Sequence, residues 1–136
     1  MLRRFTVSME DSLLDDFDAF IQDRHYKNRS EALRDLIRDR IIAKEWEADN
    51  DVMGVISLVY DHHQPKLQEK VTELQHRFHH QIVSTTHVHM DHDNCLEVII
   101  VRGKAAIVQN LADNLRALRG IRNSSLSMGS TGKNLH

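Results

Sequence analysis

The sequence predicts an α+β protein in two parts, a short βαα segment followed by a ferredoxin-like βαββαβ unit. Apolar residues recur at helical spacing in four segments, and five other segments show the alternating or continuous apolar pattern of strands. The order of these segments along the chain separates the two parts. With 136 residues, 40% of them hydrophobic, the chain is long and apolar enough for globular packing.

The first expected strand, Leu2–Met9, has one polar and one apolar face. The polar face carries Arg4, Thr6 and Ser8, and the apolar face carries Phe5, Val7 and Met9. A lone strand leaves its backbone groups unpaired, so we expect it to pair with the same strand of a second chain. Such a two-stranded ribbon fits the major groove of DNA, although an ordinary strand with a solvated face fits the pattern equally well.

Two helices are expected to follow this strand. Ser8-x-x-Asp11 resembles a capping box for a helix that reaches about Asp23. The run Asn28-Arg29-Ser30-Glu31 offers caps for a second helix, whose apolar stripe extends toward Trp46. A segment of this size, about 45 residues, cannot bury a core alone, which again favours a dimer.

Six further elements are expected after a charged linker at Glu47–Asp51. In chain order they are a strand (52–60), a helix (65–79), two strands (82–90 and 95–102), a helix (105–119) and a strand (121–128). This order is that of the ferredoxin-like split unit. The expected domains are therefore 1–48 and 52–136.

A candidate metal site lies at the end of strand 82–90. His87 and His89 are two residues apart and share one face of the strand, and the turn that follows can return Cys95 beside them. Imidazole and thiolate groups bind late first-row divalent metals. His76, on helix 65–79, is the candidate fourth ligand. Because the chain has ten histidines, solvated or packing roles are the competing interpretation.

We expect this site to lie on the sheet face that no helix covers. This follows if the even-numbered apolar residues of strands 82–90 and 95–102 pack against the domain's own helices. The ligands would then be out of reach of their own helix, so His76 would have to come from another chain. Two sheets meeting face to face would bury the apolar residues on the same side, namely Ile56, Leu58, Ile99 and Val101.

Composition restricts the compartment and the partners. The single cysteine excludes an intramolecular disulfide framework and suits a reducing compartment. No apolar run is long enough to cross a bilayer, so we expect a cytoplasmic protein without a membrane partner. The formal net charge is −2, so contacts to nucleic acid must come from a local patch.

Six motifs, taken in their order along the chain, resemble one known family. They are Arg4-Phe-Thr6-Val-Ser8, Asn28-Arg29-Ser30-Glu31-Ala32, Tyr60, His76, His87-Val88-His89 and Cys95-Leu96-Glu97. Together they resemble NikR, a family of nickel-responsive transcriptional regulators, over residues 3 to about 128. The resemblance implies a ribbon-helix-helix DNA-binding domain joined to an ACT-type regulatory domain, assembled as a homotetramer in which two DNA-binding dimers flank a central core.

The resemblance also implies roles for individual residues. His87, His89 and Cys95 match metal ligands of one subunit, and His76 matches the ligand of the facing subunit. Three imidazoles and a thiolate in a plane suit nickel(II). Tyr60 and Glu97 match positions that orient the ligands through hydrogen bonds.

Further matches concern DNA and a second cation. Arg4, Thr6 and Ser8 match a base-reading strand. Asn28, Arg29 and Ser30 match the phosphate-contacting start of the second helix. Glu31 and Asp35 match acidic positions that bind a cation in some members, and a capping residue and a solvated charge are the alternative roles here.

We therefore expect a regulator that, once loaded with Ni(II), binds a palindromic operator in double-stranded DNA and represses nickel-uptake genes. One alternative is a cytosolic metal carrier or buffer, which would have no use for the base-reading strand. Another is an ACT-type sensor of a different metal or of a small molecule; a small-molecule sensor would leave the four ligands unexplained. An enzyme is not expected, because protein ligands fill all four metal positions.

Overall fold

The computed structural model describes residues 1–136 and divides them into two compact units, Met1–Asp39 and Arg40–His136. No helix combines the length and the apolar character that a bilayer-spanning segment needs. The expected domains, 1–48 and 52–136, stay a prediction, because the division by contacts falls inside a helix rather than at the linker.

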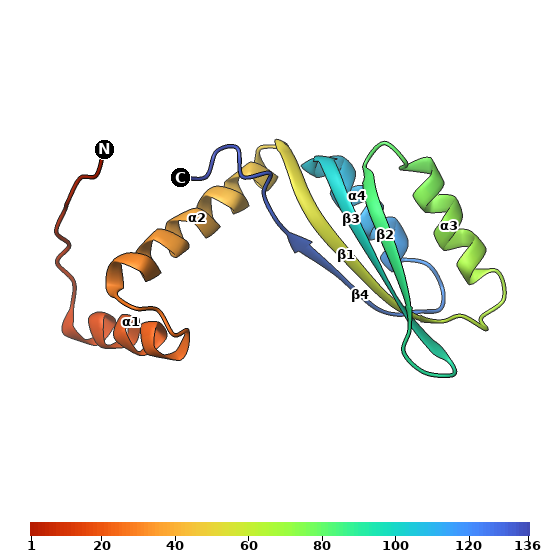
Figure 1. Cartoon of the computed structure of the whole chain (residues 1–136), viewed down its shortest axis with the longest axis horizontal. Helices are drawn as coiled ribbons and strands as arrows, with labels where there is room; N and C mark the ends of the chain where they lie inside the picture. The colour runs from red at the N-terminus through yellow and green to blue at the C-terminus, as the bar shows by residue number, and fades with distance from the viewer. The chain divides into compact units, whose positions relative to one another are not determined.

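The first unit holds α1 (Asp11–Asp23) and the beginning of α2 (Arg29–Glu47), preceded by an extended segment (Figure 1). Residues 1–10 form no strand within the single chain. The expected ribbon requires a strand from a second chain and therefore stays a prediction. Large apolar side chains of this unit are exposed, among them Phe5, Val7, Leu13 and Ile37, as expected for a surface that a partner covers.

The two helices of this unit start differently. Glu10, not Ser8, is the residue that precedes α1, and no side chain caps that helix, so the predicted capping box is wrong. The cap of α2 is confirmed, since Asn28 Oδ1 accepts the backbone N–H of Glu31 at 2.9 Å.

The second unit has the expected βαββαβ order. Its elements are β1 (Asp51–Asp61), α3 (Leu67–Arg77), β2 (Ile82–His89), β3 (Asn94–Lys104), α4 (Ala105–Arg116) and β4 (Ile121–Met128). They form one sheet in the order β2-β3-β1-β4, and every neighbouring pair is antiparallel. This is the ferredoxin-like arrangement predicted from the sequence. Helix α3 begins later than expected because Lys66, just before it, has a left-handed backbone with φ 63°.

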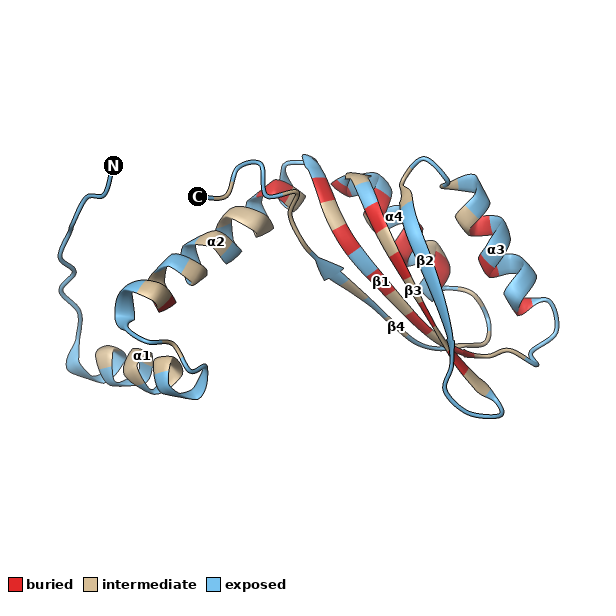
Figure 2. Cartoon of the chain, in the orientation of Figure 1, coloured by how far each residue is buried: buried red, intermediate tan, exposed pale blue.

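One face of the sheet packs against α3 and α4 to make the core. Alternate residues of β1 and β3 are buried, which Figure 2 shows as red bands on both strands. The core combines these strand residues with the apolar stripes of the two helices; among its members are Ile56, Leu58, Tyr60, Ile99, Val71, Val108 and Leu111. The free-energy gain from burying this apolar area is what holds the second unit together.

The expectation that Cys95 lies on the helix-free face is wrong. Cys95, Glu97, Ile99 and Val101 alternate along β3, and all four are buried on the helix-covered side. The sequence pattern could not decide the side, because β3 is apolar on both of its faces. The helix-free face is lined by the residues of β1 and β3 that alternate with the buried ones, including Val55, which is 39% exposed.

An irregularity in β2 explains why Ile82 does not lie on the face that the sequence pattern predicted. The β2–β3 register shifts between Ile82 and Ser84. Ile82 therefore packs partly against the core, on the same side as His87 and His89, rather than opposite to them. A strictly alternating strand would have placed Ile82 on the other face.

We predict that Ile56→Ala lowers the free energy of unfolding of the second unit by about 2–5 kcal/mol, because it leaves a cavity in a fully buried position. Urea unfolding followed by circular dichroism measures this loss. The control is Ile107→Ala on α4, where the side chain is 40% exposed and the loss should be about 1 kcal/mol or less. Equal losses for the two variants would contradict the burial pattern.

Candidate metal centre

Strand register gathers the candidate ligands at one end of the sheet. In the β1–β3 pair Tyr60 lies opposite Cys95, and in the β2–β3 pair His87 lies opposite Glu97 and His89 opposite Cys95. Residues directly opposite each other in a ladder project to the same face. These five side chains therefore share the helix-covered side of the sheet.

Glu97 is the acceptor on which this group converges. Its side chain is 7% exposed, and it accepts hydrogen bonds from the Tyr60 hydroxyl at 3.0 Å and from His87 Nδ1 at 3.1 Å. Gln75 on α3 donates its amide to the second carboxylate oxygen and accepts the Thr85 hydroxyl at 3.1 Å. The carboxylate thus accepts hydrogen bonds from two neighbouring strands, β1 and β2, and from helix α3.

The hydrogen bond to Glu97 fixes the orientation and the tautomer of the His87 ring. A carboxylate can only accept, so the hydrogen bond to Glu97 places the proton of the neutral ring on Nδ1 and leaves the lone pair on Nε2. Metal-binding histidines commonly carry such a carboxylate partner, which fixes the ring and its tautomer. Burial, and then the charge of Glu97, raises the pKa of Tyr60 and keeps its hydroxyl a donor.

Cys95 supplies the thiol of the site. It is buried, and its Sγ lies 3.4 Å from the backbone oxygen of Tyr60, to which it donates. Burial raises the pKa of the Cys95 thiol, so the group is protonated at neutral pH and would have to lose its proton to bind a metal ion.

His76 does not join the other three candidates in its own chain. It is exposed on α3 and lines a surface groove together with Glu69, Thr72 and Glu73. The opposite side of α3 is buried through Leu67, Val71 and Leu74. The two clusters whose ligand atoms all lie within 4.8 Å of one another are Asp61–His62–His63 and His63–His92–Asp93, and neither contains a predicted ligand.

Two further side chains lie at the site that the motifs did not place there. Gln75 binds Glu97, although no sequence motif pointed to it; its position next to His76 was the only available signal. The ring of His62 lies 5.4 Å from that of His89, in an edge-on arrangement. The Nδ1 atom of His62 is buried without a hydrogen-bond partner.

The candidate DNA contacts lie in the first unit. Arg4, Thr6 and Ser8 are exposed, and their side chains make no hydrogen bond within the chain. The side chain of Arg29, in contrast, is already paired within the chain: its guanidinium donates to both carboxylate oxygens of Asp18 at 2.9 Å. Ser30 is exposed at the start of α2, beside the segment that carries Ser8.

Glu31 and Asp35, the candidate ligands of a second cation, lie four residues apart on α2 and belong to neither cluster of three ligand atoms. Asp35 accepts hydrogen bonds from the Tyr26 hydroxyl at 2.8 Å and from Arg38 at 3.2 Å, so both of its oxygens are engaged. Glu31 takes part in the α2 cap through its backbone N–H. Their role as cation ligands stays a prediction.

Comparisons with known proteins match two separate stretches of the chain to two protein families. Residues 53–128 match the family described as the NikR C terminal nickel binding domain. Residues 3–44 match the ribbon-helix-helix proteins of the copG family.

Curated relatives cover the whole chain. A protein of Desulfotalea psychrophila, whose name describes it as a nickel-responsive regulator, is 67% identical over 136 residues, which is 100% of both chains. Proteins of the same description in Solibacter usitatus and Syntrophus aciditrophicus are 52% and 49% identical, each over 96% of this chain and 95% of their own.

A solved structure supports the fold of the second unit. An uncharacterized protein from Thermotoga maritima superposes with a TM-score of 0.52 at 15% identity, covering 57% of this chain and 95% of its own. At this identity the likeness concerns the fold alone.

We predict that Glu97→Gln weakens nickel(II) binding about ten- to a hundredfold. The amide that replaces the carboxylate carries donors on one side, so it cannot accept from Tyr60, His87 and Gln75 together. Competition with a chelator of known affinity measures the change. Asp113→Asn on the exposed side of α4 is the control and should bind as the parent does; a Glu97→Gln protein of parental affinity would contradict the role of this carboxylate.

Proposed function

The chain belongs to the NikR family of nickel-responsive regulators, and from this premise we propose that it represses nickel-uptake genes by binding a palindromic operator when loaded with Ni(II). One observation supports the proposal most strongly. The second unit holds a buried thiol beside an imidazole that is already oriented by a carboxylate.

His87, His89 and Cys95 would bind the metal in one subunit, and His76 would come from a facing subunit. The exposure of His76 on the outer side of α3 supports this assignment, because that side of the helix does not pack on its own sheet. When bound, nickel(II) would join two subunits through three imidazoles and one thiolate. Copper(II) prefers the same ligands and geometry, whereas zinc prefers a tetrahedron.

The shared site would form at the edge of the sheet. β2 is an edge strand, and its His87 side chain is 27% exposed while Cys95 behind it is buried. One long edge of β2 has no neighbouring strand, so a helix of a facing subunit can approach His87 and His89 from that edge. The approach does not require these residues to lie on the helix-free face of the sheet. We propose a homotetramer, a dimer of DNA-binding dimers, in which this contact is made between dimers.

In the DNA-binding dimer, Arg4, Thr6 and Ser8 would read base edges in the major groove. Asn28, Arg29 and Ser30 would hold the phosphate backbone at the start of α2. Arg29 would have to give up part of its pairing with Asp18 to do so; the ion pair is exposed, so the cost of exchanging one anion for another is small. The proposed compartment is the cytoplasm.

We predict that Arg4→Ala weakens operator binding by about 1–3 kcal/mol without changing nickel affinity. Operator DNA would first be selected from a random pool with parent protein and nickel(II), and binding would then be measured by gel shift with and without the metal. Parent protein should bind only with nickel(II).

Arg29→Ala is the matched comparison within the same unit. It should weaken binding to any sequence and reduce the salt dependence, as the loss of a phosphate contact does. An Arg4→Ala protein that separates operator from random DNA as well as the parent would contradict base reading and would favour a metal carrier instead.

A further inference from the structure

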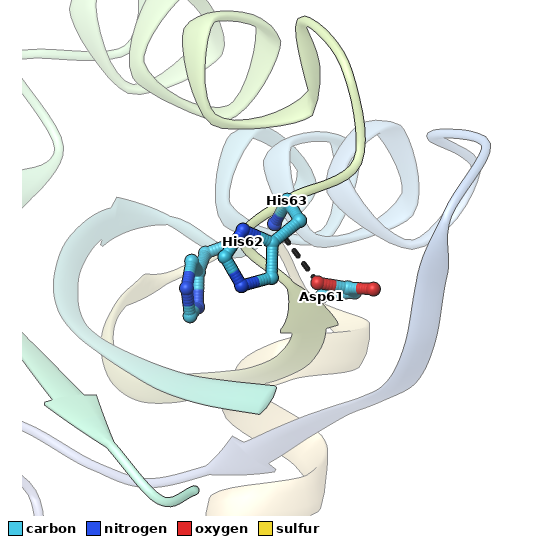
Figure 3. Close-up of side chains that lie close together, drawn as sticks. All are labelled: Asp61, His62 and His63. Carbon is cyan, nitrogen blue, oxygen red and sulfur yellow. Dashed lines mark hydrogen bonds between the residues drawn. The ribbon is translucent and has the colours of Figure 1, made fainter. Parts of the chain in front are cut away.

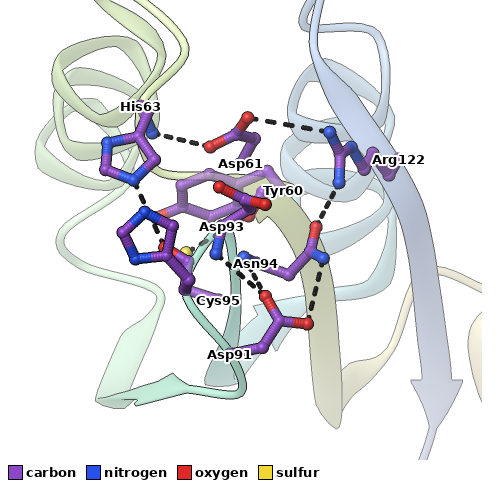
Figure 4. Close-up of polar contacts among 9 residues, drawn as sticks. Tyr60, Asp61, His63, Asp91, Asp93, Asn94, Cys95 and Arg122 are labelled. Carbon is purple, nitrogen blue, oxygen red and sulfur yellow. Dashed lines mark hydrogen bonds and ion pairs between the residues drawn. The ribbon is translucent and has the colours of Figure 1, made fainter.

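Two loops rich in histidine and aspartate meet beside the candidate metal centre. One is Asp61-His62-His63 at the end of β1, and the other is Asp91-His92-Asp93 before β3. The β1–β3 register pairs Asp61 with Asn94, and the His62 N–H donates to the Asp93 oxygen at 3.2 Å, which extends the ladder by one position. Continuing it by one more places His63 opposite His92, and the centroids of the two rings are 5.4 Å apart. Figure 4 shows His63, Asp91 and Asp93 in the two loops.

We propose that His63, His92 and Asp93 form a second binding site for a late first-row divalent metal ion. One ligand atom from each of the three lies within 4.8 Å of the others. The site shares no residue with the His87–His89–Cys95 set, and the proposal does not depend on the function proposed for that set.

Hydrogen bonds hold both loops in place. On the β3 side, Asp91 Oδ1 accepts the backbone N–H groups of Asp93 at 2.9 Å and Asn94 at 2.7 Å. On the β1 side, Asp61 Oδ1 accepts the N–H of His63 at 2.8 Å (Figure 3). The loops therefore present their side chains without a large cost in conformational entropy.

The hydrogen bonds also show which side chains are available to bind a metal ion and which already hold the loops in place. Asp61 is engaged on both oxygens, by the His63 N–H and by Arg122 at 3.6 Å, so it acts as a support. The Asp93 carboxylate and the His92 ring make no hydrogen bond in the chain and are free to bind.

His63 already has the arrangement of a metal-binding histidine. Its Nε2 lies 3.2 Å from the backbone oxygen of His92. Because a carbonyl oxygen can only accept, Nε2 carries the proton, and the neutral ring keeps its lone pair on Nδ1. A backbone carbonyl is a common partner of the second nitrogen in metal-bound imidazoles.

The chemistry of the site differs from that of the buried centre. Two imidazoles and one carboxylate suit zinc, nickel or copper, and all three residues are exposed, so water completes the coordination. Such an open site binds more weakly than a closed site with a thiolate. His62 lies between the two sites, its ring centroid 4.0 Å from that of His63 and 5.4 Å from that of His89.

The test counts bound ions by equilibrium dialysis of tag-free protein against nickel(II), and separately against zinc(II). The parent should bind one tighter and one weaker nickel ion per chain. His63→Ala/His92→Ala should lose the weaker ion, with at least a tenfold fall in its affinity, and keep the tighter one. The control is His79→Ala/His80→Ala, a second exposed histidine pair, which should keep both ions; its ring centroids are 4.0 Å apart, compared with 5.4 Å for His63 and His92.

Two additional variants keep the result interpretable. Asp93→Asn preserves side-chain shape and should weaken the second ion while the thermal unfolding curve stays parental. Cys95→Ala should lose the tighter ion and keep the weaker one, so failure of one site is distinguishable from failure of the other. The proposal is overturned if the parent binds no second ion, if His63→Ala/His92→Ala retains it, or if both histidine pairs contribute equally.

Discussion

The pairing of β1 with β3 is the constraint on which both candidate metal sites depend. It sets Tyr60 opposite Cys95, buries both against the helices, and carries Glu97 to the same side two residues further along β3. Beyond the last pair, the same register brings the 61–63 and 91–93 loops together. A slip of one residue would turn Cys95 and Glu97 toward the open face, away from Tyr60 and Gln75.

Much of the fold could be predicted from the sequence, because each element has a clear period and a recognisable boundary. The order of elements in the second unit and the α2 cap are confirmed. The side of the sheet could not be predicted, since β3 is apolar on both faces and the shift after Ile82 changes which β2 residues accompany His87. Strand register and bulges depend on how two strands pair. The apolar pattern along a single strand carries no information about that pairing.

The candidate ligands could be named from residue type and spacing, but their hydrogen-bond partners depend on packing. Gln75 reaches Glu97 because α3 packs over the sheet, and no motif encodes that contact. The loop cluster at His63 and His92 was likewise missed, because the histidines are distant in sequence and meet only through the β1–β3 ladder. The two sites then differ physically: one is buried with a protonated thiol, and the other is open to water.

The central claim is that the nickel site is shared between two chains, and mixing two defective proteins tests it most directly. His76→Ala and His87→Ala should each bind nickel(II) weakly when pure. After co-refolding, a pair of unlike chains would hold one site with both defects and one intact site. Recovery of tight binding, up to one ion per unlike pair and together with nickel-dependent operator binding, is the predicted result. No recovery in any mixture would contradict the account.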